Sequence, residues 1–254
     1  MLGLQCISGS LIIPVPPRKH LKPCRLFLAL LACSITLAIP QISAAQTGTQ
    51  RTTDSVLGLM DHAAQGFHSL TANIEHVKFT AVVNDTSKET GQLYVRKDDK
   101  MRIDITAPDQ RTILRTGDSL FVYTPKINRV EEYNLGKNRN LVDQYVLLGF
   151  GTRTTEVRKN YDVKLTGEEE LDGKKVAVLE LTPKSDDVRK QITKIQMWID
   201  EASWLPLQQK FFEATAGDYF LFHYSDLKED LKKFSENKFK QDWPKNATHV
   251  KPQP

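Results

Sequence analysis

The sequence predicts a mainly β fold, in which one large antiparallel sheet is accompanied by a few helices. From Leu70 onward, apolar and polar residues alternate in many short segments, and this period of two is typical of strands with one buried face. Turn-forming residues separate the segments at short intervals, which favours antiparallel meander connections over the long helical crossovers of a parallel sheet. The apolar face of such a sheet must be covered, and the sequence offers few helices to cover it.

The first part of the chain, residues 1–45, is predicted to be a signal peptide. Basic residues at 18–25 precede an apolar run at 26–39, and small residues at 43–45 suit a cleavage site. The apolar run is shorter than the roughly 20 residues that a membrane-spanning helix needs. We therefore expect export with cleavage, a periplasmic location, and one mature domain over residues 46–254 with polar termini.

A second interpretation of the leader depends on Cys33. The string LLAC at residues 30–33 resembles a lipobox, whose cysteine would become the acylated first residue of a membrane-anchored protein. The apolar core ahead of it would then be only residues 26–31, whereas cleavage after Ala45 uses the whole apolar run. The cleaved form is preferred, and a lipid-anchored form via Cys33 is the alternative.

Composition and motifs argue against nucleic-acid binding and against catalysis. The leader carries four basic residues and no acidic one, so the mature chain has 31 Lys and Arg against 31 Asp and Glu. Such a neutral chain lacks the basic surface that phosphate binding requires. The mature sequence contains no GxSxG, HExxH, Walker or CxxC motif. We expect no nucleic-acid partner, no catalytic or metal-binding residues, no cofactor, and a binding protein rather than an enzyme.

The mature domain is predicted to start with a helix and a meander of strands. An amphipathic helix is expected from Thr53, with Asp54 as its N-cap. A strand at residues 70–83 follows and ends at the turn-forming pair Asn84-Asp85. Further strands are expected at residues 91–97, 101–106, 111–116 and 119–123.

The second half of the domain is predicted to resume the sheet after a short helix. Apolar residues between 138 and 150 cluster on a helical face. A new strand begins at Tyr161 and leads into a hairpin at Asp172-Gly173, a pair that suits a tight turn with positive φ. The remaining strands are expected at residues 176–182, 192–199, 207–213 and 219–224, and the tail is polar and proline-rich.

The apolar members of these strands are predicted to share one face of the sheet. The residues assigned to that face are Leu93, Val95, Met101, Ile103, Ile105, Leu120, Val122, Ile195, Met197 and Ile199. Alternation predicts burial, but it does not distinguish a packed core from the wall of a cavity. The alternation alone favours a packed core, and a cavity is the alternative.

A resemblance to a known family distinguishes between them. The stretch at residues 91–133, GQLYVRKDDKMRIDITAPDQRTILRTGDSLFVYTPKINRVEEY, combines two strands, a basic pair, a proline turn and a Gly-Asp hairpin ending in Tyr-x-Pro. Weaker matches are LELTPK at 179–184 and MWID at 197–200. Through these strings and the order of its predicted elements, the stretch at residues 54–250 resembles the LolA-type outer-membrane lipoprotein carriers. The resemblance implies an incomplete antiparallel β-barrel, or half-barrel, with a helical lid around an apolar cavity.

The same resemblance implies a function and a set of partners. It indicates a periplasmic chaperone that binds the acyl chains of lipoproteins in its cavity and carries them from the inner to the outer membrane. The implied partners are acylated lipoproteins and an inner-membrane lipoprotein exporter, with an outer-membrane acceptor as a further candidate, and a monomer is expected. Two alternatives stay open: a lipid- or lipoprotein-sensing binding module, and a membrane-anchored acceptor or glycolipid carrier, which would suit an acylated Cys33.

A lid and a latch are also implied by the resemblance. The implied lid residues are Leu141, Tyr145 and Leu148, and Met101, Ile103 and Ile105 are implied to line the cavity. Members of the family commonly tie the lid to the barrel through an arginine that precedes a proline. Lys97 occupies that position here, with Arg96 beside it. Because lysine lacks the planar hydrogen-bonding fork of arginine, we expect a weaker or rearranged latch, for which either residue is a candidate.

Overall fold

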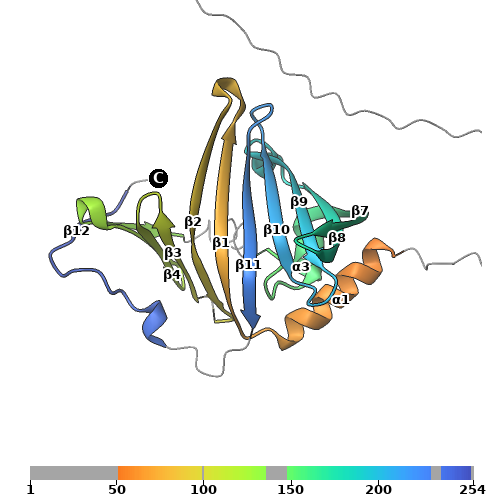
Figure 1. The fold of residues 1–254 in the computed structure, drawn as a ribbon, viewed down its shortest axis with the longest axis horizontal. Helices are drawn as coiled ribbons and strands as arrows, with labels where there is room; N and C mark the ends of the chain where they lie inside the picture. Colours follow the sequence, from red (N-terminus) through yellow and green to blue (C-terminus); the bar gives the residue numbers. More distant parts are fainter. Residues whose placement is uncertain (1–50, 99, 136–147, 230–235, 253–254) are drawn as a thin grey trace, which may run out of the picture. The chain divides into compact units, whose positions relative to one another are not determined.

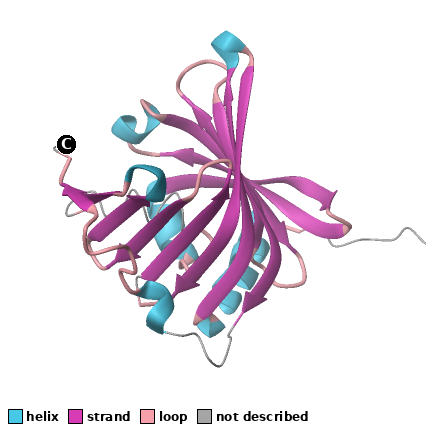
Figure 2. Cartoon of the chain, turned by 60° about the vertical axis from the view of Figure 1, so that its left-hand side comes forward, coloured by secondary structure: helices cyan, strands magenta, loops and turns pink. Residues whose placement is uncertain are grey.

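The computed structural model describes residues 51–98, 100–135, 148–229 and 236–252, and strands dominate these residues (Figure 1, Figure 2). The described strands are β1 (Ser69–Thr80), β2 (Asp85–Arg96), β3 (Lys100–Ala107), β4 (Arg111–Thr116), β5 (Ser119–Thr124), β6 (Arg129–Asn134), β7 (Tyr161–Leu171), β8 (Lys174–Pro183), β9 (Ile192–Asp200), β10 (Pro206–Glu213), β11 (Tyr219–Glu229) and β12 (Thr248–Val250). The described helices are α1 (Thr53–Gly66), α3 (Thr154–Asn160) and α4 (Asp186–Arg189), with 3-10 turns η1 (Ala81–Val83), η2 (Pro125–Ile127) and η4 (Glu236–Phe239).

The described strands form one 12-stranded sheet in the order β12-β6-β5-β4-β3-β2-β1-β11-β10-β9-β8-β7. Neighbouring strands run antiparallel, apart from the parallel pair β12 and β6. The order starts at β12 and ends at β7, so the sheet is open rather than closed into a barrel. The predicted fold class, a mainly β half-barrel with helical elements, is confirmed.

Helix α1 is capped by Thr52, and the predicted N-cap Asp54 is therefore wrong. Oγ1 of Thr52 accepts a hydrogen bond of 3.2 Å from the backbone N–H of Ser55, and Oγ of Ser55 accepts one of 3.0 Å from that of Thr52. This capping box satisfies two donors that a helix start leaves without partners. Asp54 lies in the first turn, where its negative charge interacts favourably with the positive end of the helix dipole.

The hairpin of β1 and β2 is longer than its sequence predicts. Its first strand ends at Thr80, and η1 with Asn84 in the left-handed conformation (φ 48°) makes the turn. Strand β2 starts at Asp85 rather than at Gly91. Residues 85–90 are polar and pair with β1 through backbone hydrogen bonds, so they carry no apolar alternation by which a strand is recognised.

Several short elements are not predicted by the sequence. In β6, the acidic pair Glu131-Glu132 conceals the alternation around the buried Val130. Strand β12 spans only three residues, and α3 and α4 span seven and four. Of the helix predicted near residues 138–150, positions 138–147 lie outside the described residues, and positions 148–150 form turns.

Two faces of the sheet are covered by different elements. The outer face of β4, β5 and β6 is covered by the C-terminal segment, whose Phe239 and Ala247 pack with Leu114 and Val130. The opposite face of the sheet is here called the inner face. Helix α1 packs on it through buried apolar side chains and also contacts α3 and β7. Figure 1 shows α1 beside α3 and the β7–β8 end of the sheet. Asp61 of α1 accepts hydrogen bonds of 2.7 and 2.6 Å from Thr154 at the start of α3.

Candidate functional site

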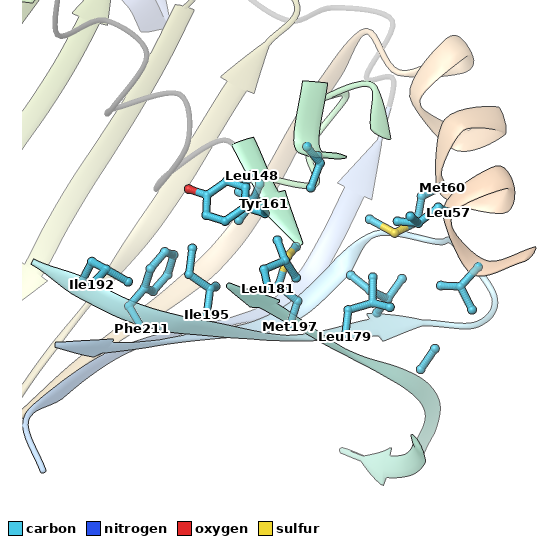
Figure 3. Packing of buried hydrophobic residues seen from close by; sticks show 14 residues of the cluster. Leu57, Met60, Leu148, Tyr161, Leu179, Leu181, Ile192, Ile195, Met197 and Phe211 are labelled. Carbon is cyan, nitrogen blue, oxygen red and sulfur yellow. The ribbon is translucent and has the colours of Figure 1, made fainter. Parts of the chain in front are cut away.

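The inner face carries two buried apolar clusters that lie next to each other. The helix-side cluster consists of Val56, Leu57, Met60, Leu148, Val157, Tyr161, Ala177, Leu179, Leu181, Ile192, Ile195, Met197, Ile199 and Phe211. Figure 3 shows Leu57 and Met60 pointing from α1 toward the strands that carry Leu179 and Met197. Strands β8, β9 and β10 supply most of this cluster. They are paired side by side, so their alternate side chains stand together on one face.

The hairpin-side cluster continues the same face onto β1, β2 and β3. It consists of Phe67, Leu70, Ala72, Ile74, Leu93, Val95, Met101, Ile103, Ile105, Phe150, Leu205 and Tyr224. Phe222 of β11 packs against both clusters, so the apolar surface is continuous across the middle of the sheet. Phe211, Phe220 and Phe222 form a ladder of ring contacts, with centroids 4.6 to 6.0 Å apart, and such rings supply a large apolar area.

A short segment, Leu148–Gly151, bridges the two clusters. Leu148 belongs to the helix-side cluster and Phe150 to the hairpin-side cluster. The two glycines between and after them have positive φ values, 87° at Gly149 and 69° at Gly151. A Cβ atom at Gly149 would lie 2.8 Å from the side chain of Met197. The segment is therefore pressed closely against the apolar face, in a backbone conformation that favours glycine.

Buried polar groups hold the bridging segment to the sheet. Gln209 of β10 is fully buried and donates a hydrogen bond of 2.5 Å from Nε2 to the backbone carbonyl of Leu148. Tyr224 of β11 donates a hydrogen bond of 2.8 Å to Oε1 of Gln209. Burial raises the pKa of Tyr224 far above its ordinary value, so its hydroxyl remains a donor. These contacts fix the segment at one point in an otherwise apolar surface.

A polar network lies where the apolar rows of β1 and β2 end. His76 of β1 stands opposite Glu89 of β2, and its Nδ1 lies 3.1 Å from Oε2 of Glu89. Nη2 of Arg111 donates hydrogen bonds of 2.9 and 2.8 Å to the two carboxylate oxygens of Glu89. One step further along β1, Lys78 forms an ion pair with Glu213 of β10. Along β1, the inner face is thus apolar at Leu70, Ala72 and Ile74 and polar from His76 onward.

The ten residues predicted to line the cavity share the inner face but divide between the clusters. Leu93, Val95, Met101, Ile103 and Ile105 are buried in the hairpin-side cluster, and Leu120 packs against it. The helix-side cluster contains Ile195, Met197 and Ile199. Val122, which stands opposite Ile113 and next to Leu120 in the same strand face, is only partly buried. That these residues contact acyl chains stays a prediction.

The predicted lid and latch residues have different positions. Leu141 and Tyr145 lie outside the described residues, whereas Leu148 is buried in the bridging segment. Lys97 is exposed, and its backbone N–H donates a hydrogen bond of 2.9 Å to the carbonyl of His68. That Arg96 or Lys97 latches a lid stays a prediction.

Arg96 contacts the C-terminal segment of the described chain. Its guanidinium donates hydrogen bonds to Asp98 and Glu236 and lies 5.3 Å from the centroid of the Phe239 ring. The hydrogen bond from Arg96 lowers the pKa of Asp98 to about 2 and lowers that of Glu236 as well. On the same outer face, Arg102 bonds to Asp104 and to Asp242 in the segment that follows η4.

Sequence reasoning missed Gln209 and the polar network. The pattern LQQKFF at residues 207–212 gives no sign that one glutamine is fully buried, because its partner Leu148 is 61 positions away. The position of His76 in the sequence favours a solvated or capping role, whereas its ring is partly buried against Phe222. Among the described residues, no group of three or more His, Cys, Asp or Glu side chains could hold a metal ion.

No helix in the described part of the chain combines the length and apolar character needed to cross a membrane.

Comparisons with known proteins show what the chain is similar to. One family model, described as "-like: Uncharacterized protein", matches residues 97–239, which is more than half of the chain. Comparison with curated proteins returned no match. Among solved structures, an uncharacterized conserved protein from Thermus thermophilus matches with a TM-score of 0.52 and 13% identity, covering 78% of this chain and 98% of that chain. This match shows a shared fold.

Two further solved structures among the matches have titles that name the LolA type or lipoprotein sorting. A LolA superfamily protein from Nitrosomonas europaea has a TM-score of 0.38 and 20% identity, covering 74% of this chain and 99% of that chain. An outer membrane lipoprotein-sorting protein domain from Vibrio parahaemolyticus has a TM-score of 0.40 and 16% identity, covering 72% and 94%.

Proposed function

The chain belongs to the family whose model matches residues 97–239, and we propose that this protein uses the inner face of its open sheet to bind acyl chains. The observation that carries the proposal is the apolar surface that runs without a break from the helix-side cluster, across Phe222, to the hairpin-side cluster. Acyl chains need such a surface because each methylene left in water costs about 0.8 kcal/mol.

The cover of this surface supports exchange rather than permanent closure. A second sheet does not close the face among the described residues; α1 and the bridging segment Leu148–Gly151 contact it instead. Leu148 and Phe150 occupy apolar space that an acyl chain would otherwise fill. Gly149 and Gly151 allow the backbone to change direction on either side of Phe150. Cargo can therefore replace the segment with little net loss of apolar contact.

The cargo, location and partners extend the proposal. The cargo is the acylated end of lipoproteins, which the protein carries across the periplasm as a chaperone, from an inner-membrane exporter to an outer-membrane acceptor. The resemblance of residues 91–133 to LolA-type carriers and the signal peptide predicted at residues 1–45 support this role. Binding and release without a chemical step make the protein a carrier rather than an enzyme, and no cofactor is needed.

A release experiment tests the proposal. Purified protein is added to spheroplasts whose membranes retain newly made lipoproteins, and the soluble fraction is analysed for stoichiometric complexes. The proposal predicts that lipoproteins appear there, bound to the protein. Free lipid bound in place of lipoprotein would indicate a lipid-sensing module or a glycolipid carrier, and no bound lipid of either kind would contradict the binding role itself.

A matched pair of variants links release to the inner face. Val122→Gln places a polar group on the partly buried inner face of β5, whereas Val82→Gln makes the same change at an exposed hairpin turn. We expect Val122→Gln to reduce release several-fold, since it adds a desolvation cost to cargo binding, and Val82→Gln to leave release unchanged. Equal effects of the two variants would place cargo binding elsewhere.

A further inference from the structure

The apolar rows of the inner face end abruptly at one polar network. Along β1, Leu70, Ala72 and Ile74 are buried and apolar, and the next residue on that face is His76. The strand pairing places Glu89 opposite His76 and Arg111 opposite the buried Ile105. The network therefore stands directly beside the apolar surface, on the face where acyl chains are proposed to lie.

Side-chain contacts fix the network in position. The His76 ring stacks on Phe222 with centroids 4.9 Å apart and an interplanar angle of 25°. Glu89 bonds to both His76 and Arg111, at distances of 3.1 and 2.8 to 2.9 Å. The three side chains are nevertheless partly exposed, at 27%, 22% and 35%. A polar group of a bound ligand can therefore reach a network that is already oriented.

The charges of this region balance. Arg111 is paired with Glu89, and Lys78 is paired with Glu213. A balanced network gives no net attraction to an anionic head group. It does offer hydrogen-bond donors, because a guanidinium has five N–H groups and, within the described residues, only Nη2 of Arg111 bonds to protein. The complementary ligand is therefore an uncharged acceptor joined to an apolar chain.

We propose that Arg111 recognises the ester carbonyl of a bound acyl chain, so that the site selects acyl esters, such as the diacylglyceryl group of a lipoprotein, over ether-linked alkyl chains. This inference rests on the proposed binding of acyl chains to the inner face. His76 and Glu89 position the guanidinium, and the apolar side chains of β1, β2 and β3 beside it hold the hydrocarbon. The geometry places the first polar atoms of the ligand at the row where the apolar side chains end.

Two glycerolipids that differ in the carbonyl test the inference. Monomyristoylglycerol and its ether counterpart, tetradecylglycerol, are titrated into the full protein by displacement of a bound fluorescent fatty-acyl probe. We expect the ester to bind roughly tenfold more tightly, because a hydrogen bond to a charged donor contributes on that order. In Arg111→Met, whose side chain has no hydrogen-bond donor, the two lipids should bind equally. Lys126→Met, which removes a cation from an exposed ion pair with Asp109, should keep the preference.

The outcomes separate this inference from the proposed function. Equal binding of ester and ether by the unmodified protein would overturn the role of Arg111 while leaving acyl-chain binding intact, and this comparison requires no variant to fold. A preference that persists in Arg111→Met would also overturn it. Binding of neither lipid, with no displacement of the probe, would contradict the proposed function and the inference together.

Discussion

The Nε2 atom of Gln209 donates a hydrogen bond of 2.5 Å to the backbone carbonyl of Leu148, and this contact holds the bridging segment against the inner face. Both residues are almost completely excluded from solvent. Because the same glutamine accepts a hydrogen bond from Tyr224, one side chain satisfies two buried polar groups. Residues 148–151 have no strand partner among the described residues. Gln209 therefore supplies the hydrogen bond that a neighbouring strand would otherwise give to the Leu148 carbonyl.

Replacement of Gln209 should therefore be more costly than loss of one hydrogen bond. Gln209→Leu leaves the Leu148 carbonyl and the Tyr224 hydroxyl buried without partners, and we expect unfolding free energy to fall by about 3 kcal/mol. Tyr224→Phe removes one hydroxyl and should cost about 1 kcal/mol. Urea denaturation followed by circular dichroism measures both. Equal losses in the two variants would show that Gln209 does not hold the segment.

Leu148 should affect stability and ligand binding in opposite directions. Leu148→Ala removes a buried side chain and is expected to lower the unfolding free energy by about 2 to 5 kcal/mol. The same change weakens the segment that competes with cargo, so affinity for a fluorescent fatty-acyl probe should increase several-fold. Leu179 is equally buried in the same cluster but belongs to β8, so Leu179→Ala should lower both stability and affinity.

A change of affinity in the same direction for both leucine variants would contradict this role of the segment. The comparison is informative because both substitutions remove the same atoms from one cluster. They differ in whether the missing side chain belonged to the wall or to its cover.

The sheet and its inner face were largely predictable because alternation is a local property. The positions of Leu93, Ile103 and Ile195 follow from which residues stand next to them in sequence and from the period of two. Pairing of neighbouring strands follows from short turns such as Asp172-Gly173, where φ is positive at both residues. The inward face could thus be assigned without knowledge of any distant contact.

Features that depend on distant segments were not predictable. Gln209 meets Leu148 across 61 positions, and Arg102 meets Asp242 across 140. The tail is polar in sequence, yet Trp243 packs on Phe121 with ring centroids 5.4 Å apart. Isolated aromatic residues in a polar segment have no periodicity. Their packing against the sheet can therefore be seen only in the folded structure.

Gly91 is expected to be essential to the β2–β3 pairing. The register of the two strands shifts between Thr90 and Gly91, and a Cβ atom at Gly91 would lie 2.1 Å from the backbone oxygen of Asp104. Because backbone cannot move away as a side chain can, Gly91→Ala should cost about 3 kcal/mol or more. Gly167 lies at the register shift of β7 and β8, and a Cβ atom there would have no other atom within 4 Å.

The matched variant Gly167→Ala should be close to neutral, since it adds a methyl group in open space and restricts the unfolded chain. Thermal unfolding of both variants gives the comparison. A large loss at position 167, or none at position 91, would show that the glycines do not differ as their surroundings indicate.

Acid should weaken the ionic contact between β2 and the C-terminal segment. The hydrogen bond from Arg96 lowers the pKa of Asp98 from its ordinary value of 3.8 to about 2, and it also lowers that of Glu236. A carboxyl whose folded-state pKa is depressed contributes stability that is complete above its unfolded pKa. That contribution is lost as the pH falls from about 3.8 toward 2, and the loss should be modest because Asp98 and Glu236 are exposed.

The variant Arg96→Gln isolates this contribution. Carboxyl carbon shifts in NMR titrations should report a pKa for Asp98 that returns toward 3.8, and the indole signal of Trp243 should report when the segment leaves Phe121. We expect the indole signal of the unmodified protein to keep its folded position to lower pH than that of the variant. If both proteins lose the folded indole signal at the same pH, the Arg96 network does not hold the segment, and packing of Phe239 and Trp243 on the outer face accounts for its attachment.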